Sequence, residues 1–120
     1  MSDAQSTPRI LHNPRCSKSR ATLELLQAQQ HAPQVQHYLE HPPSAAELGE
    51  ILDLLGMQPR ELMRRGEAVY AELGLDDAQL GREQLIAAMV ANPILIERPI
   101  VIANGRAAIG RPPQRVLDIL

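Results

Sequence analysis

The chain has 120 residues, of which 44% are hydrophobic and 22% charged, and its formal net charge at pH 7 is −2. This balance is typical of one globular domain, and the charge excludes a strong overall attraction to nucleic acid or to an anionic membrane. The aromatic residues are two tyrosines, which argues against binding of single-stranded nucleic acid by base stacking. No apolar run approaches the length of a membrane span, and a single cysteine fits a reducing cytoplasm. We therefore expect a cytoplasmic protein without an internal disulfide.

The first forty residues predict a β-α-β unit. Residues 1–8 are polar and are expected to form a disordered tail, whereas residues 9–120 are expected to form a single domain. RILHN, residues 9–13, is typical of a short strand, and apolar residues at helical spacing predict a helix over residues 16–30. QVQHYL, residues 34–39, alternates like a half-buried strand. A β-α-β unit places its two strands parallel, with a right-handed crossover.

The middle of the chain predicts a block of helices. Ser44 and Glu47 follow two prolines with the spacing of a capping box, which indicates a helix start. Gly56 ends that helix, and Pro59 suits the first turn of the next one. Helices are expected over residues 58–66, 67–75 and 82–92.

The end of the chain predicts a β-hairpin. Asn104 and Gly105 form the dipeptide most typical of a type I′ turn, and they separate apolar runs at Ile100–Ala103 and Arg106–Ile109. A short helix is expected after them, in RPPQRVLDIL. The element order predicts an α/β fold of the thioredoxin or glutaredoxin type, with a mixed four-stranded sheet and a helical insertion before the hairpin.

The single cysteine, Cys16, lies in HNPRCSKSR, where the first predicted strand passes into the first predicted helix. A thiolate at a helix start is stabilised by the helix dipole and by unpaired backbone N–H groups. Arg15, Lys18 and Arg20 add positive charge within one turn, and His12 lies just upstream. We therefore expect the pKa of the Cys16 thiol to be lowered into a reactive range. The alternative is a buried structural cysteine.

Ser19 occupies the position at which a C-x-x-C redox motif has its second thiol. A covalent adduct on Cys16 would therefore have to be resolved by a thiol from another molecule. The four histidines and the single cysteine show no metal-ligand spacing. We expect neither a metal site nor a bound organic cofactor.

Several segments share their order and spacing with one known family: HNPRCSKSR, HYLEHPPSAAEL, RELMRRGE, YAELGL, NPILIERPIVIANG and IGRPPQRVLDIL. They resemble the glutaredoxin-coupled arsenate reductase family, and the similarity runs from about Ile10 to Leu120. CSKSR and ANGRAAIGRPP are similar to a sub-branch that carries the reductase name by similarity, and Ser17 stands where the best-studied reductases have glycine. The resemblance implies a thioredoxin-like fold with a helical insert and a cis bond before Pro99.

The resemblance also assigns roles to residues. It implies that Cys16 is the nucleophile and that His12 assists thiolate formation. It implies that three arginines hold the oxyanion: Arg64 from the inserted helix, Arg98 before the hairpin and Arg111 after it.

The resemblance implies a monomeric cytoplasmic enzyme that reduces arsenate, or a similar oxyanion, to arsenite. The expected partners are glutathione as co-substrate and glutaredoxin, with no nucleic acid and no membrane. Two alternatives are a redox regulator of the Spx type that binds RNA polymerase, and a protein that binds an oxyanion or glutathione without turnover. Ser19 and the three arginines count against the regulator.

Overall fold

The computed structural model describes residues 7–120, and the chain divides into two compact units. The sheet unit contains Met1–His41 and Arg98–Leu120, and the helical unit contains Pro42–Glu97. The expected tail falls largely on residues 1–6, which lie outside the described residues; the Pro8 carbonyl accepts a hydrogen bond of 2.8 Å from the Gln34 N–H. That residues 9–120 form a single domain stays a prediction.

The sheet unit is built on a mixed four-stranded sheet. Its strands are β1 (Arg9–Leu11), β2 (Gln34–Gln36), β3 (Ile100–Ala103) and β4 (Arg106–Ile109), in the order β2-β1-β3-β4. β1 pairs parallel with β2 and antiparallel with β3, and β3 pairs antiparallel with β4. The predicted topology is confirmed.

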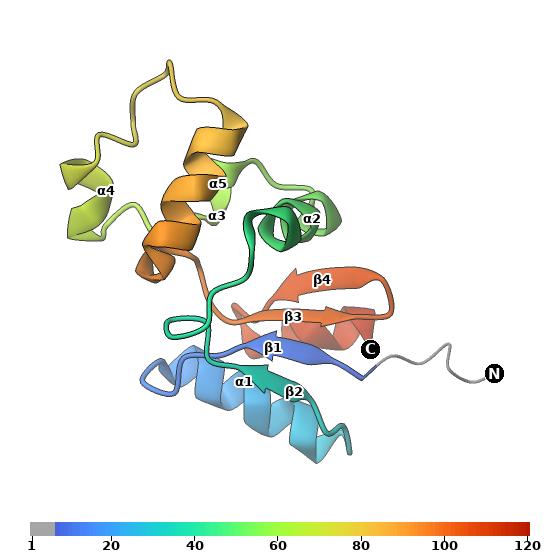
Figure 1. Cartoon of the computed structure of the whole chain (residues 1–120). Helices are drawn as coiled ribbons and strands as arrows, with labels where there is room; N and C mark the ends of the chain where they lie inside the picture. Colours follow the sequence, from blue (N-terminus) through green and yellow to red (C-terminus); the bar gives the residue numbers. More distant parts are fainter. Residues whose placement is uncertain (1–6) are drawn as a thin grey trace. The chain divides into compact units, whose positions relative to one another are not determined.

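Two helical segments cover one face of this sheet. They are α1 (Ser17–Ala28) and the 3₁₀ helix η3 (Pro113–Ile119), which contact each other (Figure 1). Ile10 and Val101, which pair across β1 and β3, pack there in one cluster with Leu26 of α1 and Val116 of η3. This packing holds α1 against the sheet.

The hairpin between β3 and β4 forms as predicted. Asn104 has φ 55° and Gly105 has φ 70°, and a type I′ turn requires positive φ at both positions. The side-chain amide of Asn104 also donates to the Ile119 carbonyl at 3.0 Å. The turn therefore joins the hairpin to the end of the chain.

β2 is shorter than the strand predicted over residues 34–39. It ends at Gln36, which pairs with Leu11, the last residue of β1, so that no strand partner remains beyond it. His37 begins a turn instead, and its carbonyl accepts from the N–H of His41 at 2.9 Å. The expected half-buried pattern is also wrong, because Val35 on this edge strand is 39% exposed whereas Tyr38 in the turn is fully buried.

The helical unit contains the predicted helices: α2 (Ala45–Leu55), α3 (Pro59–Leu62), α4 (Ala68–Glu72) and α5 (Arg82–Ala91), followed by an unpredicted 3₁₀ turn η2 (Pro93–Leu95). The capping box of α2 is confirmed, with the Glu47 N–H donating to Ser44 Oγ at 3.1 Å and the Ser44 N–H donating to Glu47 Oε1 at 3.0 Å. Gly56 ends α2 with φ 67°.

α3 is shorter than predicted, and this changes the setting of Arg64. Met63 is extended and forms a β-bridge with Ile96, and the Arg64 N–H donates to the Leu95 carbonyl at 2.7 Å. The backbone after Leu62 therefore pairs with a distant segment instead of continuing the helix. The expectation that Arg64 lies on the inserted helix is wrong.

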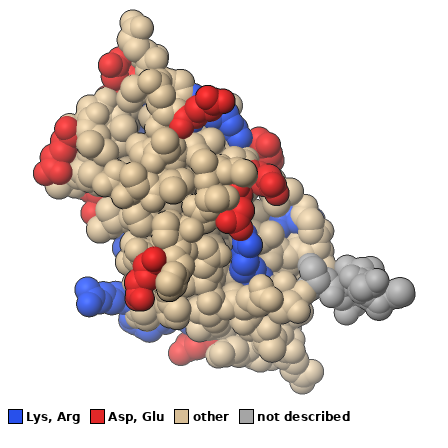
Figure 2. Space-filling model, viewed as in Figure 1, with Lys and Arg blue, Asp and Glu red and all other residues tan. Residues whose placement is uncertain are grey.

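Charges of both signs are interspersed on the face of the molecule that Figure 2 shows. That face presents no extended basic patch, in keeping with a net charge of −2. Within residues 7–120, no helix combines the length and the apolar character needed to cross a membrane.

Candidate active site

Cys16 lies at the start of α1, as the sequence predicts. It is the N-cap residue, with φ −95° and ψ 122°, and its carbonyl accepts from the Arg20 N–H at 3.0 Å. The loop before it is short, and the Cys16 N–H donates to the Asn13 carbonyl at 3.0 Å. The side chain is half-buried, so a small molecule can still reach the thiol.

The pKa of the Cys16 thiol is lowered, as expected. The predicted contribution of backbone N–H groups is confirmed, and the contributing cation is Arg98, which the residues around the thiol did not indicate. Burial alone raises this pKa, but the backbone N–H of Ser19, the guanidinium of Arg98 and the backbone N–H of Lys18 outweigh it. Arg20 instead donates through Nη1 to the Pro14 carbonyl at 2.8 Å. Backbone amides and an arginine distant in sequence therefore stabilise the thiolate.

Arg98 and Arg111 are linked to each other beside this thiol. Arg111 donates through Nε to the Arg98 carbonyl at 2.8 Å, and its Nη2 lies 3.6 Å from Cys16 Sγ. The Arg98–Pro99 bond is cis, as predicted, and so is the Arg111–Pro112 bond, which was not foreseen. The Gly110 N–H donates to the Pro99 carbonyl at 2.9 Å, which holds the segments that carry both arginines together.

His12 lies in the same unit as Cys16 and is only 5% exposed. Its Nδ1 lies 2.6 Å from Ser19 Oγ, and its ring centroid lies 5.9 Å from that of His37. Burial, then the charges of His37 and Arg20, lower the pKa of His12. The imidazole is therefore neutral at pH 7, when it can exchange a proton with its neighbours but adds no positive charge beside the thiol.

Arg64 belongs to the helical unit, where it forms two ion pairs. Its Nη1 lies 3.0 Å from Glu67 Oε2, and its Nε lies 3.7 Å from Glu97 Oε1. The geometry of the sheet unit thus gathers four of the predicted site residues: His12, Cys16, Arg98 and Arg111.

Sequence reasoning missed the part played by Ser19. It is fully buried, and its Oγ accepts from the Asn13 N–H at 3.0 Å. The Ser19 hydroxyl can therefore donate its hydrogen to Nδ1 of the neutral His12. The spacing C-x-x-S carried this signal, since a residue three positions after the N-cap lies in the first turn beside it.

Tyr38 was also missed. It is fully buried, and burial raises the pKa of its hydroxyl to about 12 against the opposing effects of Arg98 and Asn13. The phenol is therefore neutral at physiological pH. Its signal in the sequence was weak: one of two tyrosines in a chain poor in aromatic residues.

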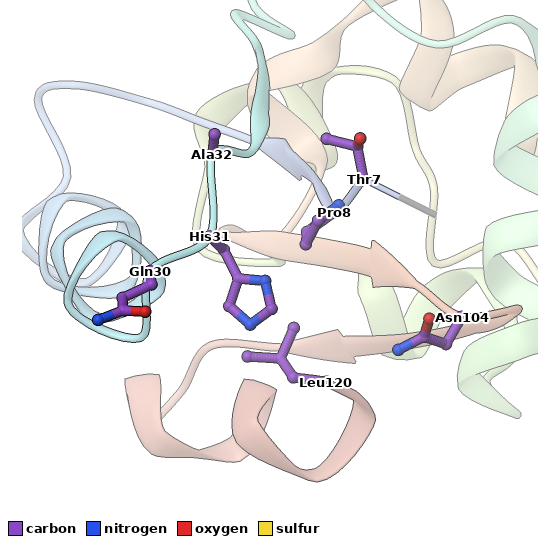
Figure 3. Close-up of a pocket in the computed structure, with 7 residues that line it drawn as sticks. All are labelled: Thr7, Pro8, Gln30, His31, Ala32, Asn104 and Leu120. Carbon is purple, nitrogen blue, oxygen red and sulfur yellow. The ribbon is translucent and has the colours of Figure 1, made fainter. Parts of the chain in front are cut away.

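Several pockets open on the sheet unit. One, of about 260 Å³, adjoins the loop before Cys16 and is lined by His12, Asn13, Pro14, Arg15, His37, Leu39 and Glu40. Another, of about 310 Å³, lies at the opposite end of α1, where His31 and Leu120 point into the same space (Figure 3). Its lining contains neither the thiol nor an arginine, so the first pocket is the one beside the candidate active site.

No group of three or more His, Cys, Asp or Glu residues within residues 7–120 is arranged to hold a metal ion. The chemical groups gathered at Cys16 are a low-pKa thiol, peptide N–H donors and two guanidinium groups. Such a set suits a nucleophile that attacks an anionic, tetrahedral substrate.

Known proteins share this chain's sequence and fold. A family model described as the ArsC family matches residues 11–119. The chain is 58% identical over 113 residues to the protein of Escherichia coli strain K12 named "Uncharacterized protein YfgD", with 93% of this chain and 95% of that protein covered. It is 47% identical over 113 residues to a Neisseria meningitidis protein named "Arsenate reductase", with 93% of this chain and 97% of that protein covered.

A solved structure, "Arsenate reductase from Vibrio cholerae", is similar with a TM-score of 0.92 at 54% identity, covering 94% of this chain and 97% of that one. The chain belongs to the ArsC family, the family of the arsenate reductases.

Proposed function

We propose that this protein reduces arsenate to arsenite through Cys16. The observation that carries the proposal is the contact of 3.6 Å between Arg111 Nη2 and Cys16 Sγ, at a thiol whose pKa is lowered by the first amides of α1 and by Arg98. The relatives from Neisseria meningitidis and Vibrio cholerae, which carry the name arsenate reductase, support the choice of substrate.

The reaction begins at the sulfur. The Cys16 thiolate attacks arsenic(V), an S–As bond forms, and an arsenate oxygen leaves as hydroxide or water. Glutathione then adds its thiol to the adduct, and arsenite leaves as Cys16 and glutathione join in a disulfide. The two thiols give up two electrons in all, which arsenic takes up on passing from As(V) to As(III). Glutaredoxin, with a further glutathione, reduces this disulfide and restores the Cys16 thiol.

The neighbouring residues have separate roles in this proposal. Arg98 and Arg111 neutralise charge on the oxyanion, and planar guanidinium groups match two of its oxygens at once. Neutral His12, linked to the helix start through Ser19, takes up the thiol proton. Arg64 is proposed as a third arginine on the oxyanion by resemblance alone. A free nucleophilic thiol persists best in a reducing compartment, so we propose a cytoplasmic location. We propose a monomer as well.

A coupled assay tests the proposal. Purified protein with arsenate, glutathione, glutaredoxin, glutathione reductase and NADPH should consume NADPH, and Cys16→Ser should abolish that consumption. Arg111→Ala should lower turnover about 10- to 150-fold, the loss expected for one charge-assisted contact. Arg111→Lys should recover only part of it, because a point charge cannot reproduce bidentate geometry.

Protection of the thiol separates this activity from binding without turnover. Arsenate or sulfate should slow alkylation of Cys16 if the site holds an oxyanion. Protection without NADPH consumption would refute the arsenate assignment while retaining an oxyanion site. The absence of both would refute the site itself.

A further inference from the structure

We propose that Tyr38 is a positioning residue of this site: its buried hydroxyl sets the position of the Arg98 guanidinium beside the Cys16 sulfur. The inference rests on the oxyanion site of the proposed function, and it adds a residue from the turn after β2 that does not itself touch the substrate.

The backbone brings this turn to the loop that carries the thiol. The parallel pairing of β1 and β2 ends at Leu11 and Gln36, and the His12 N–H donates to the Gln36 carbonyl at 2.9 Å. Both strands end on the same side of the sheet. From there the chain after β1 leads to Cys16, and the chain after β2 leads to Tyr38. Residue 38 therefore has a fixed place beside the start of α1.

The side chains of the turn alternate between the pocket and the interior. His37 and Leu39 line the pocket of about 260 Å³ beside the active-site loop. Tyr38, between them, is fully buried. The Tyr38 side chain, its hydroxyl included, is therefore enclosed by the protein and does not line this pocket.

The Tyr38 hydroxyl is surrounded by groups of the site, yet it lacks a well-formed hydrogen bond. Within residues 7–120 no partner meets ordinary hydrogen-bond geometry with Tyr38 Oη. Even so, Arg98 and Asn13 lie near enough to oppose the effect of burial on the Tyr38 pKa, and Cys16 lies near enough to raise it. The donors are therefore close to the hydroxyl but imperfectly aligned with it.

Burying a hydroxyl group costs free energy unless the group forms a hydrogen bond. Arg98 carries only donors, so the phenol oxygen can accept from it while the phenol remains neutral. When an oxyanion binds beside Cys16 and attracts Arg98, a hydrogen bond from the guanidinium to this oxygen would limit how far the guanidinium moves. Tyr38 thereby acts through Arg98, on the affinity for the anion and on the pKa of the thiol.

The test compares Tyr38→Phe with Tyr70→Phe, which deletes the chain's other phenolic hydroxyl. Tyr70 donates to Asp76 Oδ1 at 2.6 Å within the helical unit, away from the thiol-bearing loop in the chain. Alkylation of Cys16 by iodoacetamide is followed against pH and against sulfate concentration. Tyr38→Phe should weaken sulfate protection about 2- to 12-fold, the effect of one hydrogen bond. It should also move the alkylation midpoint upward by a fraction of a pH unit, whereas Tyr70→Phe should change neither.

A double variant decides whether the effect passes through Arg98. In an Arg98→Ala background, adding Tyr38→Phe should cause little further loss of sulfate protection. Full additivity would overturn the proposal. So would a Tyr38→Phe protein with lowered thermal stability but unchanged sulfate affinity and alkylation midpoint, since Tyr38 would then be structural only. Both readouts need no arsenate turnover, so they stand even if the substrate assignment fails.

A measurement on the unaltered Tyr38 covers the case in which Tyr38→Phe does not fold. The ¹³Cζ resonance of Tyr38, identified by its persistence in Tyr70→Phe, should shift when sulfate is added and when Arg98 is replaced by alanine. A Tyr38 resonance that responds to neither change would overturn the proposal.

Discussion

At the scale of the residue, the reactivity of Cys16 is decided by a competition. Burial raises the pKa of the thiol, while two backbone N–H groups and the Arg98 guanidinium lower it, and the lowering prevails. Peptide N–H groups are part of the fold and survive any side-chain substitution except one by proline. The side chains near Cys16 in the sequence therefore matter less than the one that arrives from the other end of the chain.

This order of the contributions to the pKa of Cys16 predicts how two substitutions change that pKa. Arg98→Ala should move the alkylation midpoint upward, because it removes both a hydrogen bond and a positive charge from the thiolate. Lys18→Ala should leave the midpoint almost unchanged, because the backbone N–H is kept and the exposed ammonium is screened by solvent. Alkylation rates against pH measure both. A larger shift from Lys18→Ala than from Arg98→Ala would contradict the ranking.

The lowered pKa of His12 predicts a pH dependence of stability. Buried His12 stays neutral just below its ordinary pKa of 6.5, where the unfolded chain takes up a proton. Because the unfolded state then binds more protons, the free energy of unfolding should fall as the pH drops through about 6.5, and it should continue to fall down to the folded-state pKa.

His12→Gln isolates this contribution. Urea unfolding at several pH values between about 7.5 and 5 should show a flatter loss of stability for this variant than for the parent protein. His31→Gln, at the far end of α1, is the matched control and should keep the parent slope. Equal slopes for the parent and His12→Gln would show that His12 does not carry the dependence.

At the scale of the element, the end of β4 and the start of β3 meet at a close backbone contact. Gly110 follows β4, and its N–H donates to the Pro99 carbonyl at 2.9 Å. A Cβ at this position would collide with the Thr22 side chain of α1 and would lie 2.9 Å from Pro99 Cγ. The glycine is therefore required by space rather than by backbone conformation, and it sets the approach of Arg111 to Arg98.

Gly110→Ala should destabilise the protein by about 1–3 kcal/mol, as overpacking of a close contact does. It should also weaken protection of Cys16 by sulfate, because Arg111 moves with the displaced backbone. Gly66→Ala is the control, since nothing lies within 4 Å of a Cβ at Gly66. Urea denaturation and alkylation measure the two effects, and a Gly110→Ala protein as stable as Gly66→Ala would disprove the close contact.

At the scale of the whole molecule, the features read correctly from the sequence are those that depend on neighbours along the chain. The capping box at Ser44 and the Asn104–Gly105 turn are satisfied by residues a few positions away. The extent of α3 was misjudged because Met63 pairs with Ile96, a partner no local pattern reveals. The contribution of Arg98 to the pKa of Cys16 could not be predicted from the residues around the thiol, because it depends on how β3 is placed next to β1. Only the family resemblance pointed to it.

Arg64 is the residue of the helical unit that we propose to bind the oxyanion, and a pair of variants can test this role. Arg64→Ala should reduce arsenate turnover about 10- to 150-fold if Arg64 contacts the oxyanion. Arg65→Ala is the matched control, because Arg65 adjoins Arg64, is exposed and donates to the Arg60 carbonyl at 3.3 Å. The coupled NADPH assay compares them. Equal turnover in both variants would remove Arg64 from the site and leave Arg98 and Arg111 to hold the anion.

Ser19 has a consequence for how such a protein would behave in a cell. It is fully buried and bonded to Asn13 and His12 at the place where a second thiol would close a disulfide. Under the proposed chemistry, each cycle therefore leaves the molecule disabled until a reductant arrives from outside. The working fraction of the protein would rise and fall with the ratio of reduced to oxidised glutathione, so the rate of detoxification would follow the metabolic state of the cell as well as the dose of arsenate.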